Sequence, residues 1–124
     1  MKPNAKSVLI VDDDGAILRT FTRILQRAGF TTETADSGKE ALEKIQARNF
    51  DVALIDIILG DSSGLDLLPE IAKKSPKTVK IIMTGADTYE KRSEAHKNGA
   101  DAYLTKPLNP EILLTMIQEK LEHE

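Results

Sequence analysis

The chain has 124 residues and a formal net charge of −3, and it has no Lys/Arg block, so direct binding of nucleic acid is not expected. Its content of 40% hydrophobic and 30% charged residues fits one globular domain over residues 1–124, with a core from about residue 6 to residue 121. Its apolar runs are too short to cross a bilayer and it has no cysteine, so we expect a cytoplasmic protein that does not bind membranes.

The first third of the chain alternates strand and helix patterns. Residues 7–11 predict a buried strand, and the helix pattern that follows ends where Gly29 can adopt a left-handed cap. Residues 31–35 predict a weaker strand, suited to a sheet edge. Ser37 and Glu40 have the spacing of a capping box, which predicts the start of a second helix.

The middle of the chain predicts two buried strands, over residues 52–55 and 79–83, with a helix between them near 65–74. Pro69 interrupts this helix pattern. Because proline cannot donate a backbone hydrogen bond, either the helix begins near Asp66, which puts Pro69 in the first turn, or the helix is kinked. The sequence leaves both possibilities open.

The last third predicts a polar helix, a short strand and a final helix. Asp87 and Glu90 resemble a capping box, and Gly99 is placed to end that helix. The helix offers few apolar anchors, so we expect it to shift at low cost. Residues 102–104 predict an edge strand, and Asn109–Pro110 predicts the cap and first position of the final helix.

Five strands that alternate with five helices predict a doubly wound α/β fold with a parallel sheet. The carboxyl ends of parallel strands meet along one edge, where residues distant in sequence share a crevice. The polar residues that fall there are Asp12, Asp13, Asp56, Thr84 and Lys106. We therefore expect them to form one acidic pocket, and Asp14 to cap the first helix.

Four segments at strand ends carry a family resemblance: VLIVDDD at 8–14, DVALID at 51–56, IIMTGA at 81–86 and GADAYLTKP at 99–107. Together, and in this order, they resemble the response-regulator receiver domain of two-component signalling, in its chemotaxis-regulator-like form. The resemblance covers nearly the whole chain. It implies a flavodoxin-like sheet with strand order 2-1-3-4-5, which periodicity alone does not indicate.

The resemblance makes Asp56 the phosphoacceptor, which takes a phosphoryl group from a histidine kinase or histidine phosphotransfer protein. A single aspartate at a strand end would more often face solvent, but Asp56 is expected in one pocket with Asp12 and Asp13, which favours the functional role. Three such carboxylates repel one another unless a cation intervenes. Magnesium, or alternatively manganese, suits these oxygen ligands, with Asp13 and Asp56 binding directly and Asp12 through water. The family pattern adds the backbone carbonyl of Ile58.

Three further residues have roles in the family and ordinary alternatives. Lys106 would pair with a carboxylate before phosphoryl transfer and with a phosphoryl oxygen after it, and the family commonly has a cis bond before Pro107. Thr84, followed by small residues, would move its hydroxyl to the phosphoryl group. Tyr103 would turn inward with it, although static packing of this aromatic ring is an equally good interpretation. The fourth helix, fifth strand and fifth helix would then present a switched surface to a downstream protein or fused output domain.

The sequence departs from the family at Gly60, where a proline is common, and glycine gives this loop more conformational freedom. Ile58 is large and apolar, so we expect it, beside Ala86, to restrict an attacking water, which predicts a slowly hydrolysed acyl phosphate. An aspartate-nucleophile, magnesium-dependent phosphohydrolase is disfavoured because it needs an acid where Ile58 stands. A flavin or nucleotide binder lacks its Gly-rich loop. We expect a phosphorylation-regulated switch and not an enzyme. The alternative of a receiver-like interaction module that is never phosphorylated stays open.

Arg19, Arg23 and Arg27 recur at helical spacing, and we interpret them as a solvated face in preference to a docking stripe. His96 and His123 are expected at the surface, without a catalytic role. The broad apolar face of the final helix leaves two oligomeric states open, a monomer and a phosphorylation-dependent dimer.

Overall fold

The computed structural model describes residues 5–85 and 88–122. Five parallel strands form one sheet in the order β2-β1-β3-β4-β5, which confirms the predicted doubly wound fold and its strand order. The strands are β1 (Ser7–Val11), β2 (Thr31–Ala35), β3 (Val52–Asp56), β4 (Val79–Thr84) and β5 (Ala102–Thr105). The two strands predicted at edges, β2 and β5, are the outer strands of this sheet.

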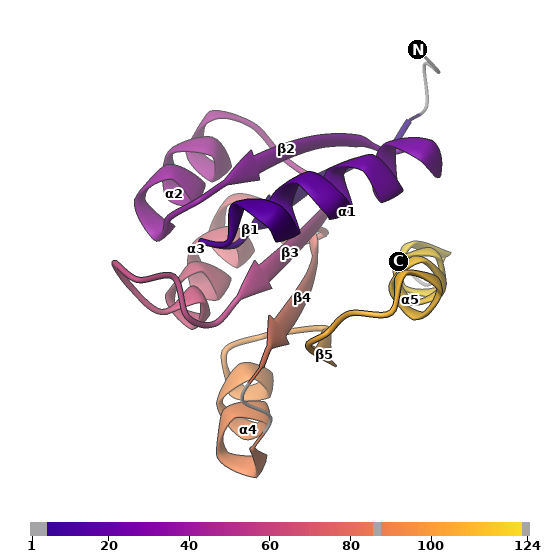
Figure 1. The fold of residues 1–124 in the computed structure, drawn as a ribbon. Helices are drawn as coiled ribbons and strands as arrows, with labels where there is room; N and C mark the ends of the chain where they lie inside the picture. Colours follow the sequence, from indigo (N-terminus) through magenta and orange to yellow (C-terminus); the bar gives the residue numbers. More distant parts are fainter. Residues whose placement is uncertain (1–4, 86–87, 123–124) are drawn as a thin grey trace.

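Helices cover both faces of the sheet (Figure 1). They are α1 (Gly15–Arg27), α2 (Gly38–Ala47), α3 (Leu67–Lys74), α4 (Tyr89–Lys97) and α5 (Pro110–Glu122), with a short 3-10 helix, η1 (Gly64–Asp66), before α3. Apolar side chains of α1 and α5 pack on one face, and those of α2, α3 and α4 pack on the other. No helix within the described residues has both the length and the apolar character needed to cross a lipid bilayer.

The central strands are buried because both of their faces are covered. Every residue of β3 and β4 is buried, and four of the five residues of β1 are buried, as expected of parallel strands under two helix layers. Apolar runs therefore marked these strands reliably in the sequence. Burial extends to the last residues, Asp56 of β3 and Thr84 of β4, which places polar groups at the carboxyl edge of the sheet.

The helix starts follow the predicted caps, with two refinements. Asp14 accepts a hydrogen bond from the Ala16 N–H at 2.9 Å, as expected of the cap of α1. Ser37 Oγ accepts from the Glu40 N–H at 3.1 Å, but the Glu40 carboxylate accepts from the Asp36 N–H at 2.7 Å instead of closing the box on Ser37. Because Glu40 reaches one residue further back, it also holds the chain that enters α2.

The open question about Pro69 is decided by η1. The chain makes one 3-10 turn before α3 begins at Leu67, so Pro69 lies in the first turn of α3, where its missing N–H breaks no helical bond. At α4 the expected cap, Asp87, lies outside the described residues. The cap within them is Thr88, whose Oγ accepts from the Lys91 N–H at 3.2 Å. The final helix starts as predicted, because Asn109 Oδ1 accepts from the N–H groups of its first turn.

Candidate functional site

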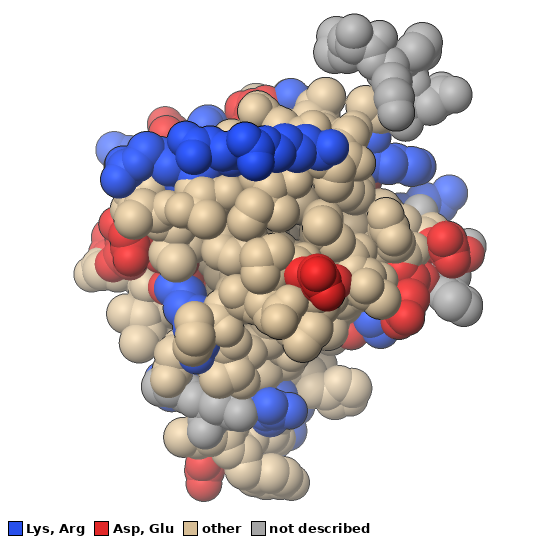
Figure 2. Space-filling model, turned by 45° about the vertical axis from the view of Figure 1, so that its right-hand side comes forward, with Lys and Arg blue, Asp and Glu red and all other residues tan. Residues whose placement is uncertain are grey.

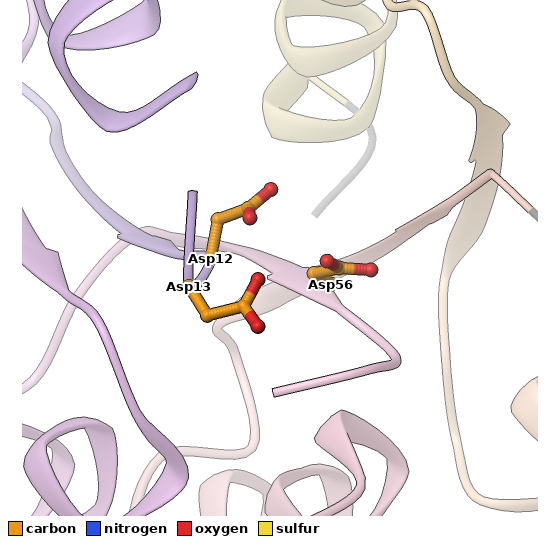
Figure 3. A group of neighbouring side chains, drawn as sticks. All are labelled: Asp12, Asp13 and Asp56. Carbon is orange, nitrogen blue, oxygen red and sulfur yellow. The ribbon is translucent and has the colours of Figure 1, made fainter. Parts of the chain in front are cut away.

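Three carboxylates meet where β1 and β3 end (Figure 3). Asp12 and Asp13 follow β1 directly, and Asp56 is the last residue of β3, the strand that pairs with β1. One oxygen from each of the three lies within 4.8 Å of the others. Asp12 has no exposed surface and Asp56 is 6% exposed, whereas Asp13 is open to solvent. The site is therefore a buried acidic wall with one accessible carboxylate.

Lys106 supplies a positive charge to this pocket from the end of β5. Its Nζ lies 2.7 Å from Asp12 Oδ2 and 3.1 Å from Asp56 Oδ2, so one ammonium bridges both buried carboxylates. The Lys106 backbone N–H donates to the carbonyl of Thr84 at 2.8 Å, which ties the turn to β4. The peptide bond between Lys106 and Pro107 is cis, as the resemblance implied.

Burial and charge shift the ionisation of both partners. Burial raises the pKa of Asp56 above its ordinary value, and the hydrogen bond and charge of Lys106 offset this only in part. For Lys106, burial alone would lower the pKa, but its bonds to Asp12 and Asp56 outweigh burial and raise it. Lys106 is therefore a cation at neutral pH, whereas ionisation of Asp56 carries a cost that an added positive charge would relieve.

The donor set fits a hard divalent cation. Three carboxylates face one ammonium, which leaves the pocket with an excess of negative charge. Carboxylate oxygens are the ligands that magnesium prefers, and the exposure of Asp13 leaves room for the waters that magnesium retains. The loop after β3 borders the same space. The Ile58 N–H lies 3.4 Å from Asp56 Oδ1, and the Ile58 side chain is 55% exposed.

The two expected switch residues lie on neighbouring strands but at different depths. Thr84 ends β4 and is fully buried at the carboxyl edge, next to the pocket. Tyr103 lies within β5, where it pairs with Ile82 and packs half-buried against the cluster under α4. The guanidinium of Arg92 on α4 lies 4.9 Å from the centre of the Tyr103 ring. Sequence analysis missed Arg92, because a cation on a polar helix gives no sign of the ring it will cover.

The helix expected to shift easily is held by few apolar contacts. Within its described residues α4 buries only Ala95, and Tyr89 at its start is 82% exposed. His96 is exposed, as expected, while His123 lies outside the described residues. Ala86, one of the small residues that follow Thr84, also lies outside them.

The arginines of α1 form a basic ridge, defined here as Arg19, Arg23 and Arg27. All three are exposed, and none has a carboxylate within 4.0 Å among residues 5–85 and 88–122. Figure 2 shows a continuous band of Lys and Arg side chains on the α1 side of the molecule. Arg19 begins the ridge near the pocket, because its guanidinium lies beside Gly15, the first residue of α1.

Comparison with known proteins agrees with this geometry. The family model for the response regulator receiver domain matches residues 8–118. The acid tolerance regulatory protein ActR of Sinorhizobium medicae is 41% identical over 114 residues, which make up 91% of this chain and 59% of ActR. Curated relatives extend well beyond the match: this chain spans between 26% and 59% of their length.

Solved structures give the same result. The crystal structure of a CheY-like response regulator receiver domain protein from Methanospirillum hungatei JF-1 has a TM-score of 0.93 at 42% identity, covering 97% of this chain and 96% of that one. A response regulator from Burkholderia pseudomallei, crystallised with a phosphorylated aspartic acid, a calcium ion and citrate, has a TM-score of 0.88 at 32% identity. That match covers 95% of this chain and 69% of the Burkholderia chain.

Proposed function

This chain belongs to the response regulator receiver domain family, the signalling switches of two-component systems, and from this premise we propose that Asp56 accepts the phosphoryl group. One observation carries the proposal: Asp56, at the end of β3, meets Asp12 and Asp13 from the end of β1 and Lys106 from the end of β5. The phosphorylated aspartate in the Burkholderia relative supports the chemistry.

In the proposed reaction a carboxylate oxygen of Asp56 attacks the phosphorus of a phosphohistidine on a histidine kinase or histidine phosphotransfer protein. The new phosphorus–oxygen bond forms as the phosphorus–nitrogen bond breaks, and the imidazole leaves with the electron pair. Lys106 neutralises charge on a phosphoryl oxygen in place of its bond to Asp56. The buried Asp12 keeps the ammonium of Lys106 in position throughout.

Magnesium, or manganese, would be held by Asp13 and Asp56 directly, by Asp12 through water and by the backbone carbonyl of Ile58. When bound, the cation supplies positive charge that offsets the charge on the transferred group. Access to the cation site and the tendency of Asp56 to lose its charge come from the chain itself. Asp13 offers an accessible ligand at the mouth, and the burial of Asp56 favours any state in which its charge is neutralised.

We propose that phosphorylation is read out through α4 and β5. Thr84 would bond the phosphoryl group, and Tyr103 would turn inward as α4 moves, which changes the α4, β5 and α5 surface offered to a downstream protein or fused output domain. Because α4 buries only Ala95, a movement of this helix would break few apolar contacts and cost little free energy. Hydrogen exchange with and without a phosphoryl mimic tests this, because equal protection of α4 in both states would contradict it.

The basic ridge is the proposed docking surface for the phosphodonor. It starts one turn from the pocket and runs along α1, so a donor with an acidic surface would be oriented with its phosphohistidine near Asp56. The alternative is the purely solvated face that the sequence favours. In the described part of the chain no carboxylate lies within 4.0 Å of these three arginines, and a complementary acidic surface would stabilise such an arrangement.

The phosphoacceptor role is tested by incubating the protein with Mg²⁺ and a small phosphodonor and then measuring its intact mass. We expect wild type to gain one phosphoryl group, and Asp56→Asn to gain none. Omitting Mg²⁺ should prevent the gain in wild type as well. A wild type that never gains the group would favour the unphosphorylated interaction module, and release of phosphate over many turnovers would favour a phosphohydrolase.

A further inference from the structure

The loop between β3 and η1 has glycine at position 60, where a proline is common in the family. Gly60 has a φ of 80°. Proline is restricted to φ of about −65°, so it could not take this place without a change of backbone conformation. Since a glycine adds freedom to the unfolded loop, other contacts must hold the loop in one position.

Asp61 makes these contacts across to another element. Its Oδ1 accepts a hydrogen bond from the Gly38 N–H at 2.9 Å, and its Oδ2 lies 3.2 Å from the Lys39 nitrogen and accepts from it. These are the first two residues of α2. Ser37 accepts the third N–H of this turn, so a cap residue and a distant aspartate together satisfy the helix start.

The loop and α2 approach one another closely at this contact. A Cβ added to Gly38 would lie 2.1 Å from Ser62 Oγ and 3.3 Å from Asp61 Oδ1. Ser62 also donates a hydrogen bond to Asp61 Oδ1 at 3.1 Å. The hydrogen bonds from Gly38 and then Lys39 lower the pKa of Asp61, so its carboxylate is ionised where the helix N-terminus favours a negative charge.

The other side of the same loop borders the acidic pocket. Gly60 packs beside Asp13, since a Cβ at Gly60 would lie 3.7 Å from Asp13 Oδ2. The loop is closed on itself by the Leu59 N–H, which donates to the Ser62 carbonyl at 3.2 Å, and by a bridge between Ile58 and Ser63. A displacement at Asp61 is therefore transmitted to Ile58 and Gly60, next to the carboxylates.

We infer that Asp61 is a positioning residue for the metal and phosphoryl site: by bonding to the start of α2 it holds the loop of residues 57–63 so that Ile58 and Asp13 keep a cation-binding arrangement. This inference rests on the proposed function. Asp61 itself touches neither the cation nor the phosphoryl group. Its bonds to α2 restrain a loop whose Gly60 adopts a conformation that proline cannot take.

The test compares wild type with Asp61→Ala and Asp61→Asn in the full chain. Calorimetric titration with MgCl₂ measures the Kd, and phosphorylation by a small donor is followed across Mg²⁺ concentrations. For Asp61→Ala we expect a Kd about tenfold higher, at the lower end of the effect of losing a residue that orients metal ligands. Phosphorylation should be slow at low Mg²⁺ and return to the wild-type rate at saturating Mg²⁺, since Asp61 acts on binding of the cation and not on the transfer itself.

Asp61→Asn removes only part of the contact. Its amide oxygen can still accept from the Gly38 N–H, whereas the bond from the Lys39 N–H and the negative charge are lost, so its Kd should rise less than that of Asp61→Ala. Asp66→Ala is the matched control, because Asp66 is also exposed and makes no capping bond through its side chain, and it should bind Mg²⁺ as wild type does. An unchanged Kd in Asp61→Ala, or equal losses in the Ala and Asn variants, would overturn the positioning role. A wild type that neither binds Mg²⁺ nor gains a phosphoryl group would overturn the proposed function with it.

Discussion

The ammonium of Lys106 lies 2.7 Å from Asp12 Oδ2, although the two residues are 94 positions apart in the chain. Asp12 has no exposed surface, so its carboxylate depends on protein groups for neutralisation. The same ammonium reaches Asp56. Lys106 therefore holds β5 to the ends of β1 and β3 and also faces the proposed phosphoacceptor, which links stability to signalling chemistry at one side chain.

Replacing Lys106 by methionine is expected to destabilise the protein by about 2–4 kcal/mol, because it leaves Asp12 and Asp56 buried without their cation. Urea denaturation at pH 7 without divalent cations measures this. Lys73→Met is the control, since Lys73 pairs with Glu70 at the exposed surface and should lose less than about 0.5 kcal/mol. Equal losses in the two variants would show that the buried pairing contributes nothing special.

The raised pKa of Asp56 makes stability depend on pH. Folded Asp56 keeps its proton over a range in which the unfolded chain, with an ordinary pKa of 3.8, has released it. Its contribution to the free energy of unfolding therefore falls as pH rises from about 3.8 through the folded-state pKa. Asp56→Asn removes this cost while Lys106 keeps its bond to Asp12, so we expect the free energy of unfolding at pH 7 to rise.

The gain from Asp56→Asn should disappear below about pH 4, where the wild-type carboxyl is protonated in both states. Thermal unfolding between pH 3.5 and 8 without Mg²⁺ checks this course. Asp36→Asn, at an exposed aspartate outside the pocket, should change little at any pH. A constant difference between wild type and Asp56→Asn across the range would mean that packing, and not ionisation, causes the gain.

The sequence predicted those parts of the fold that depend on local pattern. Apolar runs marked the strands because both sheet faces are covered, and the caps at Asp14 and Asn109 act through their own neighbours. The strand order needed the family resemblance, since each parallel pairing joins segments that periodicity treats separately. The start of α3 stayed open for a related reason: η1 is fixed by the return of the loop under β3, where a Cβ on Gly64 would lie 2.0 Å from the Asp56 carbonyl oxygen.

The pocket residues were predictable because each lies at or just after the end of a strand, and strand ends share one edge. Side-chain contacts between different helices, strands and loops could not be predicted in this way. Asp61 bonds to Gly38, 23 positions away, and Arg92 covers Tyr103 from another element, so neither appears in a local motif. Residues that orient a site through tertiary contacts become visible only when the elements are placed in space.

Reversing the basic ridge is expected to slow phosphotransfer from a protein donor. The triple variant Arg19→Glu, Arg23→Glu and Arg27→Glu should reduce the rate about tenfold or more at low ionic strength, because electrostatic attraction raises association rates by such factors. The loss should shrink as salt is added. Phosphorylation by a small donor should be unchanged, since the pocket is untouched.

The control for the ridge carries the same charge change elsewhere. Lys73, Lys74 and Lys77 are exposed at the end of α3 and the turn before β4, on the edge of the sheet away from the pocket. Their triple replacement by glutamate should leave the rate from the protein donor near that of wild type. Stopped-flow or rapid-quench transfer assays with both donors give the comparison. Equal slowing by the two triple variants would mean that net charge alone governs the encounter.

Ile58 is expected to prolong the life of the acyl phosphate. Its side chain is 55% exposed two residues after Asp56, so it presents an apolar surface where a water would approach the phosphoryl group. In Ile58→Asn an amide can hydrogen-bond that water. One such bond of about 1 to 1.5 kcal/mol corresponds to a roughly tenfold faster hydrolysis. Loss of the phosphoryl group, followed by intact mass after removal of the donor, measures the lifetime.

Ile112 provides the control for this variant, because it is also 55% exposed but lies on α5. Ile112→Asn makes the same chemical change without placing an amide beside Asp56, so its lifetime should match wild type. Both variants lose similar apolar surface, and any general effect on stability should be shared. A faster hydrolysis confined to Ile58→Asn would therefore place the barrier to water at this side chain, whereas an unchanged lifetime would locate it in the buried wall of the pocket.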